Sequence, residues 1–83
     1  MKVEPNLFIK NIAAQFDGID PKNLSFQTRL DEIGGWDSLT ALSILTMVEK
    51  EYGVSIEGED IMENPTIEDL YNTVKSRYFR VLP

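Results

Sequence analysis

Apolar side chains recur every three or four positions in several stretches of this chain, and this spacing is typical of helices with one buried face. The first stretch begins near Pro5, a residue suited to the first turn of a helix, and the pair Asp17-Gly18 is expected to end it. Its apolar positions are Leu7, Phe8, Ile12 and Phe16. The pattern predicts a first helix with these side chains toward the core.

Residues 19–37 lack this period and are expected to form a long connection. Asp20-Pro21 indicates a turn near its start. Gly34-Gly35 closes the connection, and this pair permits backbone angles that other residues avoid. Four apolar residues are expected to anchor it on the core: Leu24, Phe26, Leu30 and Ile33.

The second helix is the most clearly predicted. Asp37 or Ser38 can cap its start, and Gly53 is expected to end it in a left-handed conformation, with Val54 folding back onto the helix. The apolar stripe consists of Leu39, Leu42, Leu45, Val48 and Tyr52. Two further residues, Ala41 and Ile44, widen the stripe, so we expect the helix to pack on more than one neighbour.

A short third helix is predicted near Glu59–Glu63, with Ile61 and Met62 turned inward. The last helix is expected to begin at Thr66-Ile67-Glu68-Asp69, which is close to a capping box. It should bury Leu70, Val74 and one of the tyrosines Tyr71 and Tyr78. No segment alternates like a strand, so the predicted fold is all-α. We expect one domain over residues 1–83, a small four-helix bundle of three longer helices and one short one, with a long loop before the second helix.

Composition narrows the function classes. Apolar residues make up 42% of the chain and charged residues 27%, which is typical of a globular domain. The absence of cysteine and histidine removes thiolate chemistry, the commonest general base and the commonest metal ligand, and no metal site is expected. No apolar run approaches the roughly 20 residues that span a bilayer, and Met-Lys-Val-Glu-Pro does not resemble a secretory signal. We expect a soluble, cytoplasmic domain without membrane insertion.

The net charge of −6 is unevenly distributed. Residues 1–29 carry four bases and three acids, residues 30–70 carry eleven acids and one base, and residues 71–83 carry three bases. The middle segment therefore has a charge of −10. Such a segment argues against nucleic acid as a partner and favours proteins with basic surfaces. The alternative that the acids only keep the protein soluble remains open.

No catalytic motif is present. Ser38 lacks the flanking glycines of a nucleophile elbow, and the sequence has no glycine-rich phosphate loop and no calcium-loop spacing, so we expect no enzymatic activity. Ser38 can still be modified by another protein. It opens an amphipathic helix after a Gly-Gly turn, where a phosphate ester would face free N–H groups and the positive end of the helix. From the residues alone, a simple capping role for Ser38 is the alternative.

Several segments together resemble the acyl carrier protein family. Gly35-Trp36-Asp37-Ser38-Leu39 is similar to the family's Asp-Ser-Leu motif at the start of a second helix, and Val48-Glu49-Lys50-Glu51-Tyr52-Gly53 is similar to the end of that helix. Leu30-Asp31-Glu32-Ile33-Gly34 and Asn64-Pro65-Thr66-Ile67-Glu68-Asp69-Leu70 resemble the segments before the motif and before the last helix. The resemblance covers residues 5–80 in the family's order and spacing.

The resemblance implies a covalent cofactor. Ser38 would receive 4′-phosphopantetheine from coenzyme A through a magnesium-dependent phosphopantetheinyl transferase. The thiol of this arm would then hold acyl groups as thioesters and present them to successive acyl-loading and acyl-using enzymes with basic surfaces. The same resemblance implies that Asp37 helps the transferase to recognise the serine. It places Leu39, Leu42 and Thr46 on the face turned toward the enzymes, and Glu49 and Glu51 at the acidic end. For Leu39 and Leu42, core packing remains the alternative.

Two departures from the family pattern are informative. Trp36 stands where many members have a small residue, and anchoring of the loop is expected rather than a contact with the arm. Thr40 and Ser43 replace positions that are often acidic in carriers of general fatty acid biosynthesis, which leaves room for a dedicated pathway.

We therefore expect a stand-alone, monomeric acyl carrier in lipid metabolism, since the acidic balance favours acyl cargo. An aminoacyl or peptidyl carrier, or one for polyketide or surface-polysaccharide assembly, is the alternative within the class. Outside the class, the alternative is an unmodified helical adaptor.

Overall fold

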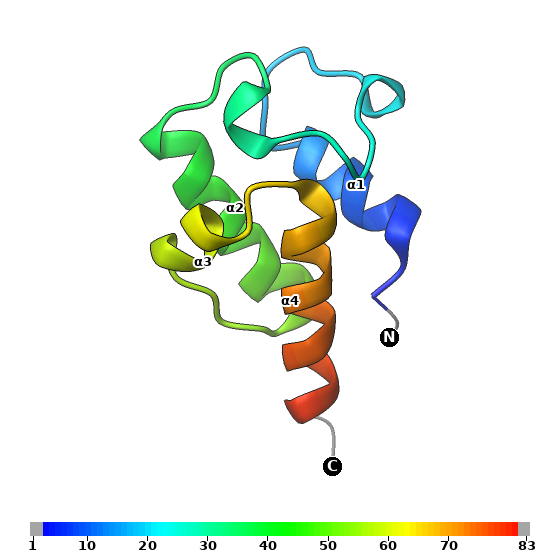
Figure 1. Cartoon of the computed structure of the whole chain (residues 1–83), viewed down its shortest axis with the longest axis vertical. Coiled ribbons are helices and arrows are strands. Elements are labelled where there is room, and N and C mark those ends of the chain that lie inside the picture. The colour runs from blue at the N-terminus through cyan, green and yellow to red at the C-terminus, as the bar shows by residue number, and fades with distance from the viewer. Residues whose placement is uncertain (1–2, 82–83) are drawn as a thin grey trace.

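The computed structural model describes residues 3–81, with side chains up to residue 79. Four α-helices surround one core: α1 (Pro5–Ala13), α2 (Ser38–Tyr52), α3 (Gly58–Glu63) and α4 (Ile67–Val81). Two 3₁₀ turns, η1 (Pro21–Asn23) and η2 (Leu30–Glu32), interrupt the long connection that crosses one end of the bundle in Figure 1. Between residues 3 and 81 there is no strand, only an isolated bridge between Arg29 and Thr66. The predicted all-α fold is confirmed.

The core is built from one face of each long helix. α4 packs against both α1 and α2, and α3 packs against α2. The fully buried large side chains come from all three long helices and from the long connection: Phe8, Ile12, Leu30, Ile44, Ile67, Leu70, Val48 and Val74. Both Tyr71 and Tyr78 are buried as well, and the Tyr71 hydroxyl donates a 2.7 Å hydrogen bond to the carbonyl of Val3.

α1 ends earlier than the sequence pattern predicts. Glu4 caps its start by accepting hydrogen bonds from the N–H groups of Asn6 and Leu7, and the helix stops at Ala13. Phe16 lies after a turn beyond the helix and is still buried. Leu7 was predicted to be inward but is 46% exposed, because Phe8 and Ile12, four residues apart, already fill the inner face.

The long connection is attached to the start of α4. Leu30 donates its N–H to the carbonyl of Pro65, and the N–H groups of Ile67 and Glu68 donate to the carbonyls of Thr28 and Phe26. Leu30 and Ile33 are buried anchors as predicted, whereas Leu24 and Phe26 are only half-buried. These backbone bonds hold the loop that precedes α2 in a defined position.

Two predicted inward faces are wrong. On α2 the buried residues are Ile44, Met47, Val48 and Tyr52, whereas Leu39 and Leu42 are 71% and 57% exposed. On α3, Ile61 is buried as expected. Met62, by contrast, is 83% exposed, because a six-residue helix turns only one side toward its neighbours and that side carries Asp60 and Ile61.

Candidate functional site

The start of α2 is fixed by a reciprocal pair of hydrogen bonds. The Asp37 carboxylate accepts a bond from the Thr40 N–H at 2.8 Å, and the Thr40 hydroxyl accepts one from the Asp37 N–H at 2.9 Å. Asp37 is thus the cap, and Ser38 is the first residue of the helix. Of the two caps allowed by the sequence, the structure selects Asp37, and the role of Thr40 in the capping box was missed.

The Ser38 hydroxyl is available for chemistry. The residue is exposed, and among the residues that the structure describes no hydrogen-bond partner of its side chain is found. Because it occupies the first turn, Ser38 lies at the positive end of a 15-residue helix, where the first N–H groups have no partner within the helix. An anion bonded to its oxygen would be stabilised there.

The turn before Ser38 is held by aromatic packing. Gly35 adopts a φ of +92°, a conformation that favours glycine, and the N–H of Trp36 donates to the carbonyl of Ile33. The indole ring of Trp36 stacks on the Phe16 ring, with 6.4 Å between centroids and 26° between planes. Trp36 is half-buried against the core, which confirms the anchoring role expected for it.

The recognition residues expected on α2 form a continuous exposed stripe. Leu39, Leu42, Thr46 and Glu49 follow one another at spacings of three and four, and all four are exposed. The core alternative for Leu39 and Leu42 is therefore wrong. A groove of about 540 Å³ runs beside this stripe between α1 and α2, with Asn11, Gln15 and Ser43 in its lining. The Glu49 carboxylate also accepts a 3.4 Å hydrogen bond from the Ser55 hydroxyl.

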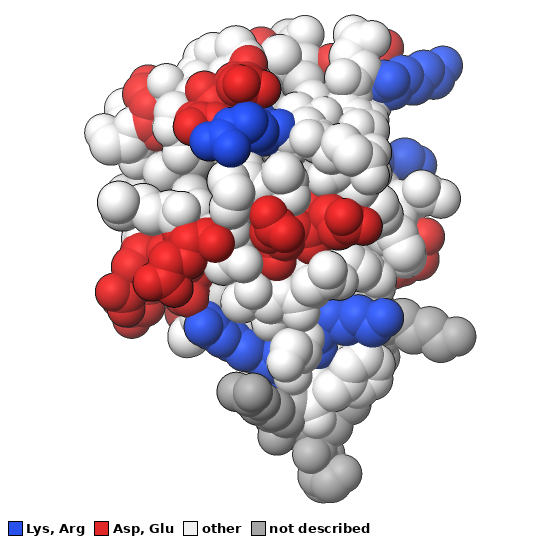
Figure 2. All heavy atoms as spheres, in the orientation of Figure 1, with Lys and Arg blue, Asp and Glu red and all other residues white. Residues whose placement is uncertain are grey.

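Acidic side chains are unevenly distributed over the surface of the molecule. In Figure 2 they gather over α3, where Glu57, Glu59, Asp60 and Glu63 lie. Near η2, the guanidinium of Arg29 forms two hydrogen bonds with the Asp31 carboxylate and lies 3.8 Å from that of Glu32. The hydrogen bond to Asp31 raises the pKa of Arg29 above its ordinary value.

One ion pair was not foreseen from the sequence. The Asp60 carboxylate accepts hydrogen bonds from both terminal nitrogens of Arg77, at 2.8 and 2.9 Å, and from the N–H of Glu57. These bonds lower the pKa of Asp60 and join α3 to α4. The pair is separated by 17 residues along the chain, so no local motif could have indicated it.

Between residues 3 and 81, no group of three or more acidic side chains is arranged to hold a metal ion. No helix in the same range is both long and apolar enough to cross a membrane.

The sequence of the chain matches a known protein family. The sequence profile of the family described as "Phosphopantetheine attachment site" matches residues 8–74, a range that contains Ser38 and the starts of α2, α3 and α4.

Several curated proteins are similar over most of the chain. A non-reducing polyketide synthase of Zymoseptoria tritici is 34% identical over 68 residues, or 82% of this chain. The conidial yellow pigment biosynthesis polyketide synthase of Penicillium expansum is 32% identical over 66 residues, or 80% of this chain, and a non-reducing polyketide synthase of Elsinoe fawcettii is 32% identical over 68 residues, or 82%. The matched region is only 3% of each relative's own length.

Proposed function

Since the chain belongs to the family of phosphopantetheine attachment domains, whose members carry covalently attached 4′-phosphopantetheine, we propose that Ser38 is the attachment residue. The protein would act as a carrier that holds acyl intermediates as thioesters and presents them to biosynthetic enzymes. The observation that carries this proposal is the exposed Ser38 hydroxyl, which is not used in capping and opens a long helix.

The residues around Ser38 fit a phosphate ester. Asp37 satisfies the Thr40 N–H, so the serine oxygen can be esterified without loss of the cap. The remaining N–H groups of the first turn and the helix dipole favour a negatively charged phosphate. The exposed position also leaves room for a modifying enzyme and for a long flexible arm.

The attachment step is a phosphoryl-type transfer at the serine oxygen. The Ser38 Oγ forms a bond to the phosphorus that carries the pantetheine of coenzyme A, and the bond from this phosphorus to the adenosine bisphosphate oxygen breaks. The products are the serine phosphodiester and adenosine 3′,5′-bisphosphate. The hydroxyl proton passes to a base of the transferase, since this chain has no histidine and the Asp37 carboxylate is engaged in the cap.

When bound, the group supplies the thiol that this cysteine-free chain lacks. The chain's own contribution is positioning and recognition. The exposed stripe of Leu39, Leu42, Thr46 and Glu49 adjoins Ser38 on the same helix, so an enzyme that docks on this stripe reaches the attachment point. The transferase and the acyl-using enzymes are proposed to bind here through apolar contacts and basic surfaces, with Asp37 contributing to recognition. No catalytic role is proposed for the chain.

A polyketide-type intermediate is the cargo class that we propose. The matched relatives are polyketide synthases, which supports this class over the cargo of general fatty acid biosynthesis. Aminoacyl and surface-polysaccharide carriers share the arm and differ in the loading enzyme, so loading assays separate them.

The test is incubation of the chain with coenzyme A and a promiscuous phosphopantetheinyl transferase, followed by intact-mass measurement. We expect addition of a single phosphopantetheine, absent in the Ser38→Ala variant and retained in a Ser43→Ala control on the same helix. No addition to the unaltered chain would contradict the carrier function and favour the unmodified adaptor.

A further inference from the structure

α3 is too short to hold its position by itself. It has six residues, and isolated helices shorter than about 12–15 residues are only marginally stable in water. It packs against α2, and its inner face contributes the buried side chain of Ile61 to the core. The orientation of α3 therefore depends on the further bonds that tie it to the rest of the chain.

Polar side chains tie α3 to α4 at both ends of the short helix. Near its start, the Asp60 carboxylate accepts hydrogen bonds from Nη1 and Nη2 of Arg77, at 2.9 and 2.8 Å. Directly after its end, Oδ1 of Asn64 accepts a 3.0 Å hydrogen bond from the Thr73 hydroxyl. Nδ2 of Asn64 donates to the Asp60 carbonyl, so the two ties are connected. We call Asp60, Asn64, Thr73 and Arg77 the α3–α4 latch.

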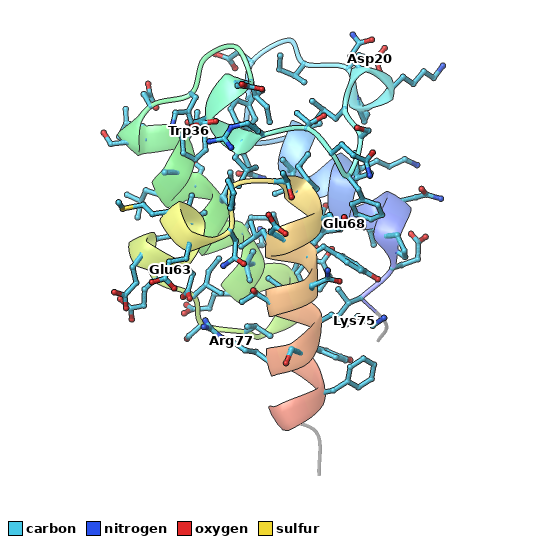
Figure 3. All side chains as sticks on the ribbon, viewed as in Figure 1. Asp20, Trp36, Glu63, Glu68, Lys75 and Arg77 are labelled. Carbon is cyan, nitrogen blue, oxygen red and sulfur yellow. The ribbon has the colours of Figure 1, made fainter. Side chains whose placement is uncertain are left out.

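Arg77 holds more than one part of this region. Its Nη1 also donates a 3.4 Å hydrogen bond to the carbonyl of Ser55, in the loop between α2 and α3. In Figure 3, Arg77 extends from α4 toward this loop, whereas Lys75 extends from the opposite side of α4. The side chain of Asp60 is only 11% exposed, so water screens its ion pair with Arg77 only in part. One guanidinium thus fixes both the loop before α3 and the start of α3.

α3 adjoins the surface around Ser38. Met62 is 83% exposed and lines a surface hollow together with Trp36, which lies two residues before Ser38. The backbones of residues two positions apart are separated by at most about 7 Å. A typical protein interface covers about 800 Å² of each partner, which is roughly a disc of 16 Å radius. An enzyme that encloses Ser38 therefore also covers the adjoining part of α3, including the exposed acids Glu59 and Glu63.

We propose that Arg77 is a positioning residue, which through the α3–α4 latch holds α3 in the orientation that the phosphopantetheinyl transferase binds. This inference rests on Ser38 being the attachment residue. Arg77 acts through Asp60 and not through contact with the reacting atoms. Because Ser38 is held by the separate cap of Asp37 and Thr40, loosening of α3 should weaken binding of the transferase and not the transfer step.

The experiment measures transfer from coenzyme A by a promiscuous transferase, with the concentration of the full chain varied and the product read by intact mass. We expect Arg77→Gln to raise KM for the chain about three- to tenfold, with kcat changed by less than about twofold. Thr73→Val, which removes only the bond to Asn64, should raise KM less. The double variant Asp60→Asn, Arg77→Gln should raise KM no further than Arg77→Gln alone, because the two residues act as one pair.

Two control variants separate positioning from charge and from stability. Lys75→Gln removes the same positive charge from the other side of α4 and should not raise KM, since a more acidic chain attracts basic partners at least as well. Ile12→Val weakens the core in α1, where Ile12 is fully buried, and should also leave KM unchanged. Circular dichroism checks that each variant is folded, and Thr73→Val carries the test if Arg77→Gln is not.

NMR spectra give a readout of α3 that does not depend on turnover. The methyl signal of Met62 should shift in Arg77→Gln and stay in place in Lys75→Gln, whereas the signal of Met47, buried on α2, should stay in both. An unchanged KM in folded Arg77→Gln, or an equal rise in Ile12→Val, would overturn the inference while the mass gain still supports the carrier function. Absence of any mass gain on the unaltered chain would refute the carrier function itself and the inference with it.

Discussion

The carboxylate of Asp37 and the hydroxyl of Thr40 each accept a hydrogen bond from the other residue's backbone N–H, at 2.8 and 2.9 Å. This pair completes the cap of α2 without the side chain of Ser38. Ser38, which lies between them in the sequence, is consequently free to be modified without loss of the cap that stabilises the helix.

Ser38→Ala should therefore leave the free energy of unfolding nearly unchanged, within about 0.5 kcal/mol. Asp37→Ala should lower it by about 0.5–2 kcal/mol, because the Thr40 N–H loses its acceptor. Denaturant titrations followed by circular dichroism measure both values. A loss for Ser38→Ala as large as that for Asp37→Ala would contradict the assignment of the cap to Asp37.

The ion pair between Asp60 and Arg77 should make stability depend on pH. Hydrogen bonds from Arg77 and from the Glu57 N–H lower the pKa of Asp60 below its ordinary value of 3.8. A carboxyl group with a lowered pKa in the folded state contributes stability above its unfolded pKa, and this contribution is lost as the pH falls through the folded pKa.

Asp60→Asn is accordingly expected to lower the free energy of unfolding by about 1–3 kcal/mol at neutral pH. The difference from the unaltered chain should shrink toward zero as the pH falls below 3.8. The matched control is Glu59→Gln, since Glu59 is exposed on the same helix and has no ion-pair partner within the described residues. A pH-independent difference for Asp60→Asn would show that charge pairing with Arg77 does not stabilise the fold.

Local signals explain why the helices and their ends could be predicted. Gly53 ends α2 with a φ of +66°, and Thr66 caps α4 by accepting from the Asp69 N–H, both as the sequence indicates. The end of α1 could not be placed, because Phe16 continues the apolar spacing although the chain has already turned at Ala14.

The exposed residues of the site were harder to predict, because the packing of the helices determines which side chains are buried. Apolar residues surround much of α2, so periodicity alone could not separate the core residues Ile44 and Met47 from the exposed Leu39 and Leu42. The orientation of α2 is determined by its contacts with α3 and α4.

Association with partner enzymes should slow as salt increases. The exposed acids Glu57, Glu59 and Glu63 around α3 would attract basic partners over a Debye length of about 10 Å at 0.1 M ionic strength. Stopped-flow binding of the unmodified chain to a phosphopantetheinyl transferase measures the rate. The double variant Glu59→Gln, Glu63→Gln should show a weaker salt dependence. Association rates that stay constant from low to high salt would indicate that these acids act only as solubilising charge.

Ser43 provides the most specific test of partner choice. By the family resemblance, enzymes of general fatty acid biosynthesis bind acids on the first half of the second helix, where this chain has Thr40 and Ser43. The structure distinguishes these two positions, because the Thr40 hydroxyl is already used in the cap. It accepts a hydrogen bond from the Asp37 N–H and donates one to the Asp37 carbonyl. Ser43 is half-buried in the lining of the groove between α1 and α2 and has no side-chain hydrogen bond among the described residues.

Ser43→Glu should therefore improve the loaded protein as a substrate of a fatty acid elongation enzyme. One added surface ion pair is worth about 0.2–1 kcal/mol, which corresponds to an increase in kcat/KM of about 1.4- to 5-fold. Ser76→Glu is the matched control, since it adds the same charge at an exposed serine of α4. If both variants raise turnover equally, net charge alone is responsible. If neither does, Ser43 does not discriminate between partners, and the expectation of a dedicated pathway loses its main support.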